Sequence, residues 1–91
     1  MIAKLISYIK MYFDKVLDVR GLVCPQPLLQ TKKSLSAMAS GTILRVLATD
    51  PGAVIDLKVF AEQDGHELIY LSEDSQEFIF HIRKKLEFNN V

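Results

Sequence analysis

Four short segments rich in apolar and β-branched or aromatic residues, bounded by turn residues, predict β-strands; apolar and polar residues alternate in the first of them, with Val16 as the exception. The first begins at Lys15 and is expected to end near Leu22 or Val23, and the other three cover 42–49, 66–71 and 77–83. A polar loop at 72–76 is short enough to join the last two strands as an antiparallel hairpin.

Two segments between these strands carry apolar residues at the helical spacing of three and four. The first starts at Pro25 and Pro27, which fit only a first helical turn because proline has no N–H, and its core side is predicted to be Leu28, Thr31, Leu35 and Met38. The second follows Asp50, the expected cap, and ends near Gly65; its core side is predicted to be Ala53, Val54, Leu57, Phe60 and Ala61.

The N-terminal residues form a further apolar stripe, made of Ile2, Leu5, Ile6, Ile9 and Phe13. Lys4 and Lys10 interrupt it and no small-residue cleavage site follows, which argues against an export signal. We therefore expect a short amphipathic helix that packs on the open face of the sheet or on a second copy of the chain.

The order β-α-β-α-β-β after the N-terminal helix predicts an α/β two-layer sandwich, with a mixed four-stranded sheet and two helices on one face. We divide the chain into an N-terminal extension (1–13), one domain (14–88) and a C-terminal tail (89–91). Right-handed crossovers bring Cys24 and Asp50 to the same edge. The open face is predicted to carry His81 and an apolar patch that needs a cover, made of Val16, Ile43, Leu47, Ile69, Leu71 and Ile79.

Composition narrows the class of protein. The 91 residues are 49% apolar, enough for one core, and 11 Lys and Arg balance 11 Asp and Glu, so net charge directs the chain to neither nucleic acid nor membrane. A single cysteine and the lack of a membrane-length apolar run indicate a cytoplasmic protein. We expect no metal site, since neither His66 nor His81 has a second ligand nearby. Runs of basic residues are usually solvated, and binding of an acidic partner or RNA is the less favoured interpretation of them. The residues that would form such a basic surface are Lys32, Lys33, Arg83, Lys84 and Lys85.

Cys24 is the strongest candidate for chemistry, because it lies where a strand gives way to a helix. The helix dipole and the N–H groups of Gln26 and Leu28 are expected to lower the thiol pKa and so favour the nucleophilic thiolate. A small buried hydrophobic role is the alternative, and the flanking Pro25 and Pro27 argue against it by holding the sulfur outward.

Three further residues are candidates for supporting roles near Cys24. Arg20 either favours an anionic sulfur or is solvated, and Gly21 shapes the turn before Cys24. Asp50 is foremost a helix cap, with partner docking or sulfur handling as the second interpretation.

Three blocks of sequence together resemble the TusA (SirA-like) sulfur carriers: 17–27, which contains the Cys-Pro-x-Pro motif, 49–53 and 65–68. The resemblance covers roughly residues 15–85. It implies the same sandwich fold, with Cys24 as the carrier of sulfane sulfur in the form of a persulfide. It also implies a cysteine desulfurase or rhodanese-type donor and a protein acceptor, no cofactor beyond the covalent sulfur, and neither membrane nor direct nucleic-acid binding. Such carriers serve tRNA thiolation, molybdenum cofactor assembly, sulfur oxidation and selenium handling.

The chain departs from this family at two places. The N-terminal helix lies outside the usual core, and residues 55–58 read Ile-Asp-Leu-Lys where members often have Arg-Asp-Ile-Pro. Two other functions stay open from the residues: an RNA-binding module of similar topology, and a thiol redox sensor.

Overall fold

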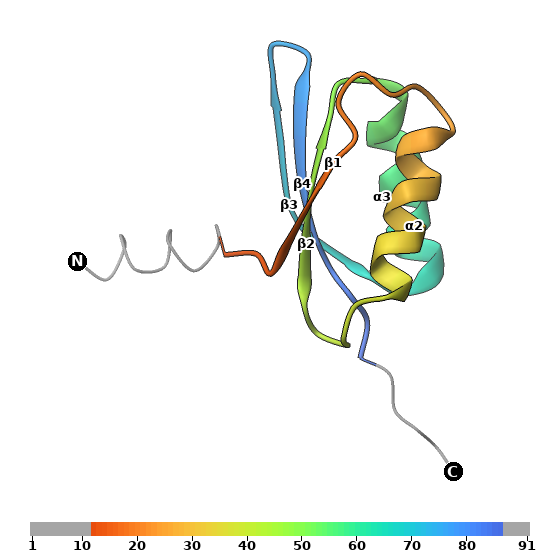
Figure 1. Ribbon diagram of the computed structural model, residues 1–91, viewed down its shortest axis with the longest axis vertical. Coiled ribbons are helices and arrows are strands. Elements are labelled where there is room, and N and C mark those ends of the chain that lie inside the picture. The colour runs from red at the N-terminus through yellow and green to blue at the C-terminus, as the bar shows by residue number, and fades with distance from the viewer. Residues whose placement is uncertain (1–11, 87–91) are drawn as a thin grey trace, which may run out of the picture.

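Four strands and two helices follow one another in the computed structural model, which describes residues 12–86 (Figure 1). They are β1 (Lys15–Asp18), α2 (Gln26–Ser36), β2 (Ile43–Ala48), α3 (Gly52–Asp64), β3 (Glu67–Asp74) and β4 (Glu77–Arg83). The sheet order is β1-β2-β4-β3, with β1 parallel to β2 and the other neighbours antiparallel. Figure 1 shows both helices on one side of the sheet, so the predicted two-layer fold is confirmed.

The core lies between the sheet and the two helices, as the sequence alternation predicted. Leu44, Val46 and Ala48 of β2 are at most 1% exposed. They pack in one cluster with Leu35, Leu57, Phe60, Phe80 and Ile82. Thr31 is also buried on this side, where its hydroxyl donates a hydrogen bond to the Pro27 carbonyl. Burial of this apolar surface is the main stabilising contribution to a domain of this size.

Two predicted strand boundaries are wrong. β1 ends at Asp18 because the chain turns at once: the Leu22 N–H donates to the Val19 carbonyl, and Gly21 has a φ of +82°. β3 extends to Asp74, and the hairpin loop is only Ser75 and Gln76, both with positive φ. A two-residue hairpin with this backbone matches the twist of the strands, so the polar residues before it remain paired.

A β-bulge at Ile69 changes which side chains of β3 face the core. Leu68 is opposite Ile82 and Tyr70 opposite His81, so Ile69 is the extra residue in the ladder. Leu71 consequently packs against the core, and its predicted place in the open-face patch is wrong.

The open face is covered in part by aromatic side chains. His81 lies there as predicted, but it is fully buried, with the Phe13 ring 5.8 Å and the Tyr70 ring 5.1 Å from its own. Tyr12 and Phe13 are not helical, and residues 1–11 of the predicted N-terminal helix lie outside the described residues. Within residues 12–86, neither helix has the length and hydropathy needed to cross a membrane.

Candidate functional site

Cys24 lies in the loop between β1 and α2, at the edge of the sheet where β2 also ends and α3 begins (Figure 1). Two hydrogen bonds tie this loop to the β2–α3 junction. The Gly21 N–H donates to Thr49 Oγ1 at 2.8 Å, and the Cys24 N–H donates to Asp50 Oδ2 at 2.9 Å. The exposed cysteine is therefore held in place by its backbone while its side chain stays accessible.

Asp50 serves both helices at this edge. One carboxylate oxygen accepts the hydrogen bond from Cys24, and the other accepts from the Gly52 N–H at 3.2 Å. The second contact satisfies a free amide of the first turn of α3, which is the capping role predicted for Asp50. The first contact joins Asp50 to the backbone of Cys24, as its second interpretation, sulfur handling, would require.

The two prolines differ in their environment. Pro27 is buried in the first turn of α2, whereas Pro25 is exposed beside the cysteine, and the Cys24–Pro25 peptide bond is cis. The Gln26 N–H, expected to stabilise a thiolate, donates to the Val23 carbonyl at 2.9 Å instead.

The Cys24 sulfur faces α3. Its thiol donates a hydrogen bond to Asp56 Oδ2 at 3.4 Å. This bond, partial loss of hydration and the negative charges of Asp56 and Asp50 raise the thiol pKa above its usual value. The predicted lowering is therefore wrong, because the sulfur meets a carboxylate and the Gln26 amide is already used within the loop.

Arg20 is held by a neighbour on its own strand end. Its guanidinium donates two hydrogen bonds to Asp18, at 2.9 and 2.7 Å, and lowers the pKa of that carboxyl to about 2. Glu77 lies 3.8 Å away on the other side. The guanidinium is thus placed on carboxylates rather than on the sulfur.

Comparison with known proteins identifies the family of this chain. The model of the family described as Sulfurtransferase TusA matches residues 15–84. The chain belongs to the TusA family. It is 51% identical to the sulfur carrier protein TusA of Allochromatium vinosum, over 79% of this chain and 95% of that protein. It is 44% identical to the putative sulfur carrier protein YrkI of Bacillus subtilis, over 78% and 95%. A SirA-like protein from Desulfitobacterium hafniense has a similar structure, with a TM-score of 0.69 and 27% identity, covering 80% of this chain and all of that one.

Asp56 is a site residue that was not predicted from the sequence of this TusA-family protein. The contact with Cys24 joins residues 32 positions apart, and it depends on how α3 packs beside the loop. One signal was available, since Asp56 is the residue that segment 55–58 shares with the Arg-Asp-Ile-Pro pattern of the family.

Exposed apolar side chains lie next to Cys24 in the chain and on the two helices that start near it. Val23 is 67% exposed and Ile55, next to Asp56, is 61% exposed. The other members of this apolar collar are Leu22, Leu29 and Val59. Apolar residues placed around a reactive group are typical of a surface that a protein partner covers.

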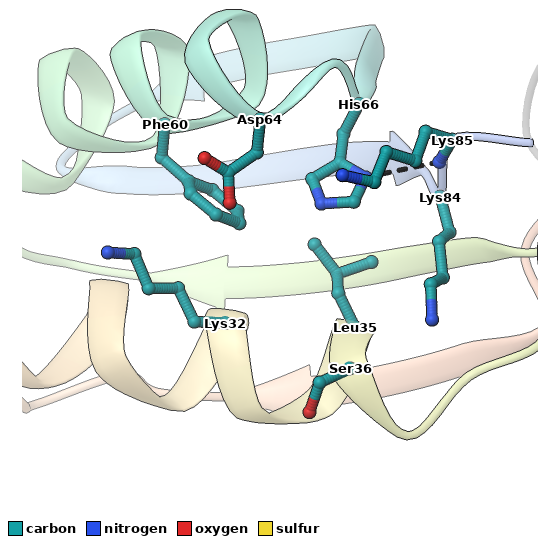
Figure 2. A pocket seen from close by; sticks show the side chains of 8 residues that line it. All are labelled: Lys32, Leu35, Ser36, Phe60, Asp64, His66, Lys84 and Lys85. Carbon is teal, nitrogen blue, oxygen red and sulfur yellow. Dashed lines mark hydrogen bonds between the residues drawn. The ribbon is translucent and has the colours of Figure 1, made fainter. Parts of the chain in front are cut away.

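A hollow lies at the end of the helix layer opposite to Cys24 (Figure 2). Its volume is about 310 Å³, and its lining includes Lys32, Lys84, Lys85, Phe60 and His66. His66 Nδ1 accepts a hydrogen bond from the Lys85 N–H at 3.1 Å. Cys24 is not part of this hollow, which is lined by the second half of each helix and the chain after β4.

Three of the five residues of the predicted basic surface, Lys32, Lys84 and Lys85, line this hollow together with Asp64. Arg83 pairs with Glu67 at 2.7 Å, and the Lys84 ammonium donates to the Met38 carbonyl, so both are engaged within the protein. Among residues 12–86, no group of three His, Cys, Asp or Glu side chains is arranged to hold a metal ion.

Proposed function

We propose that this TusA-family protein is a sulfur carrier in which Cys24 holds sulfane sulfur as a persulfide and delivers it to another protein. The observation that carries the proposal is the exposed thiol of the only cysteine, on a loop fixed by Thr49 and Asp50 at the start of two helices. Membership of a family whose members are named sulfur carriers supports it.

The chemistry consists of two displacements at sulfur. The Cys24 thiolate attacks the outer sulfur of a donor persulfide, the donor S–S bond breaks, and the donor cysteine leaves as a thiolate that takes up a proton. An acceptor thiolate then attacks the outer sulfur of Cys24–S–SH and releases Cys24. Each step exchanges one S–S bond for another, so it needs no external oxidant, reductant or cofactor.

The partners that suit this chemistry are a cysteine desulfurase or a rhodanese-type donor, and a downstream protein that accepts sulfur. The exposed residues of the apolar collar offer these proteins a docking surface. We assign neither a nucleic acid nor a membrane as a partner. A cytoplasmic, reducing compartment would keep the single thiol available for exchange. We assign this activity to the domain 14–88, with residues 1–13 as an extension and 89–91 as a tail.

Intact-mass spectrometry after incubation with a cysteine desulfurase and cysteine tests the proposal. The wild type is expected to gain about 32 Da, one sulfur atom, which a reducing agent removes. Cys24→Ser should gain nothing while its circular dichroism stays unchanged, because the side chain is exposed. If neither a desulfurase nor a rhodanese-type donor adds sulfur to the wild type, the proposed function is wrong.

The same experiment separates the two other functions. A redox sensor would form a sulfenic acid with peroxide and take no sulfur from a donor. An RNA-binding module would bind RNA in a strongly salt-dependent way, and binding would survive Cys24→Ser.

A further inference from the structure

A carboxylate that forms no ion pair within residues 12–86 lies against the reactive sulfur. Asp56 is in the second turn of α3, and its Oδ2 accepts the hydrogen bond from the Cys24 thiol at 3.4 Å. The ion pairs within residues 12–86 are Arg20 with Asp18, Arg20 with Glu77, and Arg83 with Glu67, so neither Asp56 nor Asp50 has a cationic partner there.

This arrangement favours the protonated sulfur. The hydrogen bond to Asp56 exists only while Cys24 carries its proton, and a thiolate would instead face the negative charges of Asp56 and Asp50. The raised pKa of the Cys24 thiol agrees with this geometry. Because the thiolate is the nucleophile, the free protein presents its sulfur in the less reactive form.

Asp56 can be reached from outside the molecule. It lines a groove of about 200 Å³ between α2 and α3, together with Leu28, Val59 and Phe60. The charged side chains that also line the groove are Lys32 and Asp64. The Lys32 ammonium lies over the Phe60 ring, 5.5 Å from its centre, rather than on Asp56. A carboxylate that is accessible and lacks an ion pair is complementary to a basic group on a docked protein.

We propose that Asp56 restrains the nucleophile of the free carrier, and that a basic side chain of the docked sulfur donor releases it by pairing with Asp56. The inference rests on the proposed function of Cys24 as the sulfur-carrying residue. Pairing removes the negative charge that holds the thiol proton, so that the thiolate can attack the donor's outer sulfur. The donor S–S bond breaks, and the proton from Cys24 ends on the departing donor cysteine.

The restraint would act on release as well as on loading. A thiol of higher pKa is a poorer leaving group, so Cys24 also surrenders sulfur more slowly while Asp56 is unpaired. The exposed cysteine would then be protected in the free protein from oxidants and from unintended thiol exchange, both of which need thiolate.

Alkylation by iodoacetamide across a range of pH tests the restraint without any sulfur donor. Asp56→Asn removes the charge and keeps the shape, and it should raise the alkylation rate at neutral pH about two- to fivefold, the effect typical of one exposed charge interaction. The titration of the rate should also move to lower pH. Glu62→Gln, on the same helix, exposed and outside this groove, should behave as the wild type. Identical profiles for Asp56→Asn and the wild type, with Asp56→Ala in agreement, would overturn the proposal.

Loading by two donors tests the role of the partner. Asp56→Asn should load faster than the wild type from inorganic polysulfide, which brings no basic side chain, but no faster from a cysteine desulfurase that loads the wild type. Equal acceleration with both donors would show that no partner cation acts on Asp56. If the wild type takes sulfur from neither donor, the proposed function fails, and the alkylation profiles still decide whether Asp56 restrains the thiol.

Discussion

The two ends of the helix layer differ in charge and in chemistry. At the end where the helices start, Cys24 lies beside the carboxylates of Asp50 and Asp56. At the other end, Lys84, Lys85 and Asp64 border a hollow of about 310 Å³ that contains no cysteine (Figure 2). Lysines therefore accompany a carboxylate at the far end, whereas Asp50 and Asp56 have no cationic partner among residues 12–86. The reactive group lies at the acidic end, so a basic partner suits it better than an acidic one.

Asp50→Ala should have the largest effect on the Cys24 end. It removes the acceptor for the Cys24 N–H and for the Gly52 N–H at once. Loss of the cap is expected to lower stability by about 1 kcal/mol. Loss of the hydrogen bond to the Cys24 N–H should slow sulfur loading about tenfold, because small errors in position are costly to a displacement reaction. This effect should outweigh the about two- to fivefold gain from removing one negative charge near the thiolate. Rapid-quench mixing with a desulfurase, followed by mass spectrometry, measures the rate, and Glu62→Gln is the control for loss of a carboxylate elsewhere on α3. A loading rate equal to that of the wild type would mean that Asp50 acts only as a cap.

Replacing Pro25 and Pro27 together by Ala should have a smaller effect at the same end. The unfolded chain gains entropy, which costs roughly 0.4–1 kcal/mol per site, and Pro27 also loses packing because it is buried. The loop should remain tied through Asp50, so we expect a loading rate about threefold lower and a retained fold. Urea titration and loading kinetics check both parts. Unchanged kinetics would show that the prolines do not help to present the sulfur.

His81→Phe should change stability without changing sulfur transfer, since His81 lies on the sheet face away from the helices. Both ring nitrogens are buried without a hydrogen-bond partner among the described residues, so an apolar ring should stabilise the domain by about 1 kcal/mol. Burial, with the charge of Arg45, also lowers the His81 pKa.

The pH dependence follows from the sign of that shift. The unfolded chain binds a proton near pH 6.5, its ordinary value, while the folded protein does so only at lower pH. Wild-type stability should therefore fall more than that of His81→Phe as pH drops below 6.5. Thermal melts at neutral and acidic pH measure the difference. Parallel losses in the two proteins would contradict the assignment to His81.

Lys85→Ala tests the far end and should have the smallest effect. The Lys85 side chain borders the hollow of Figure 2 and is remote from Cys24, so loading from polysulfide should be unchanged within error. A clear loss of loading from polysulfide would show that the two ends of the helix layer are coupled.

Much of the fold could be predicted because alternation and helical spacing report burial directly. Leu44, Val46 and Ala48 face the core as expected, and β4 has the predicted bounds. The bulge at Ile69 could not be predicted, because one additional residue in a strand has no signature when its neighbours are also apolar. As a result, Leu71 packs against the core instead of lying on the open face of the sheet.

The position of the site could be predicted from the sequence, but the direction of the Cys24 pKa shift could not. Cys24 and Asp50 share an edge because both precede helices that start after parallel strands. The sign of the thiol pKa shift depends on which group the sulfur meets across the gap to α3, and Asp56 is distant in sequence. The usual effect of a helix N-terminus predicted a lowered thiol pKa. That direction is wrong because the Gln26 N–H is already bonded to the Val23 carbonyl.

Radiolabelled sulfur offers the most direct test of the central claim that Cys24 carries sulfur between proteins. The wild type is loaded from labelled cysteine and a desulfurase, separated from the donor, digested for peptide mapping, and in a second portion mixed with a thiol acceptor protein. The account predicts label on the peptide that contains Cys24, followed by its loss from Cys24 and its appearance on the acceptor. Label on another residue, or label that stays on Cys24 when an acceptor is present, would contradict the account.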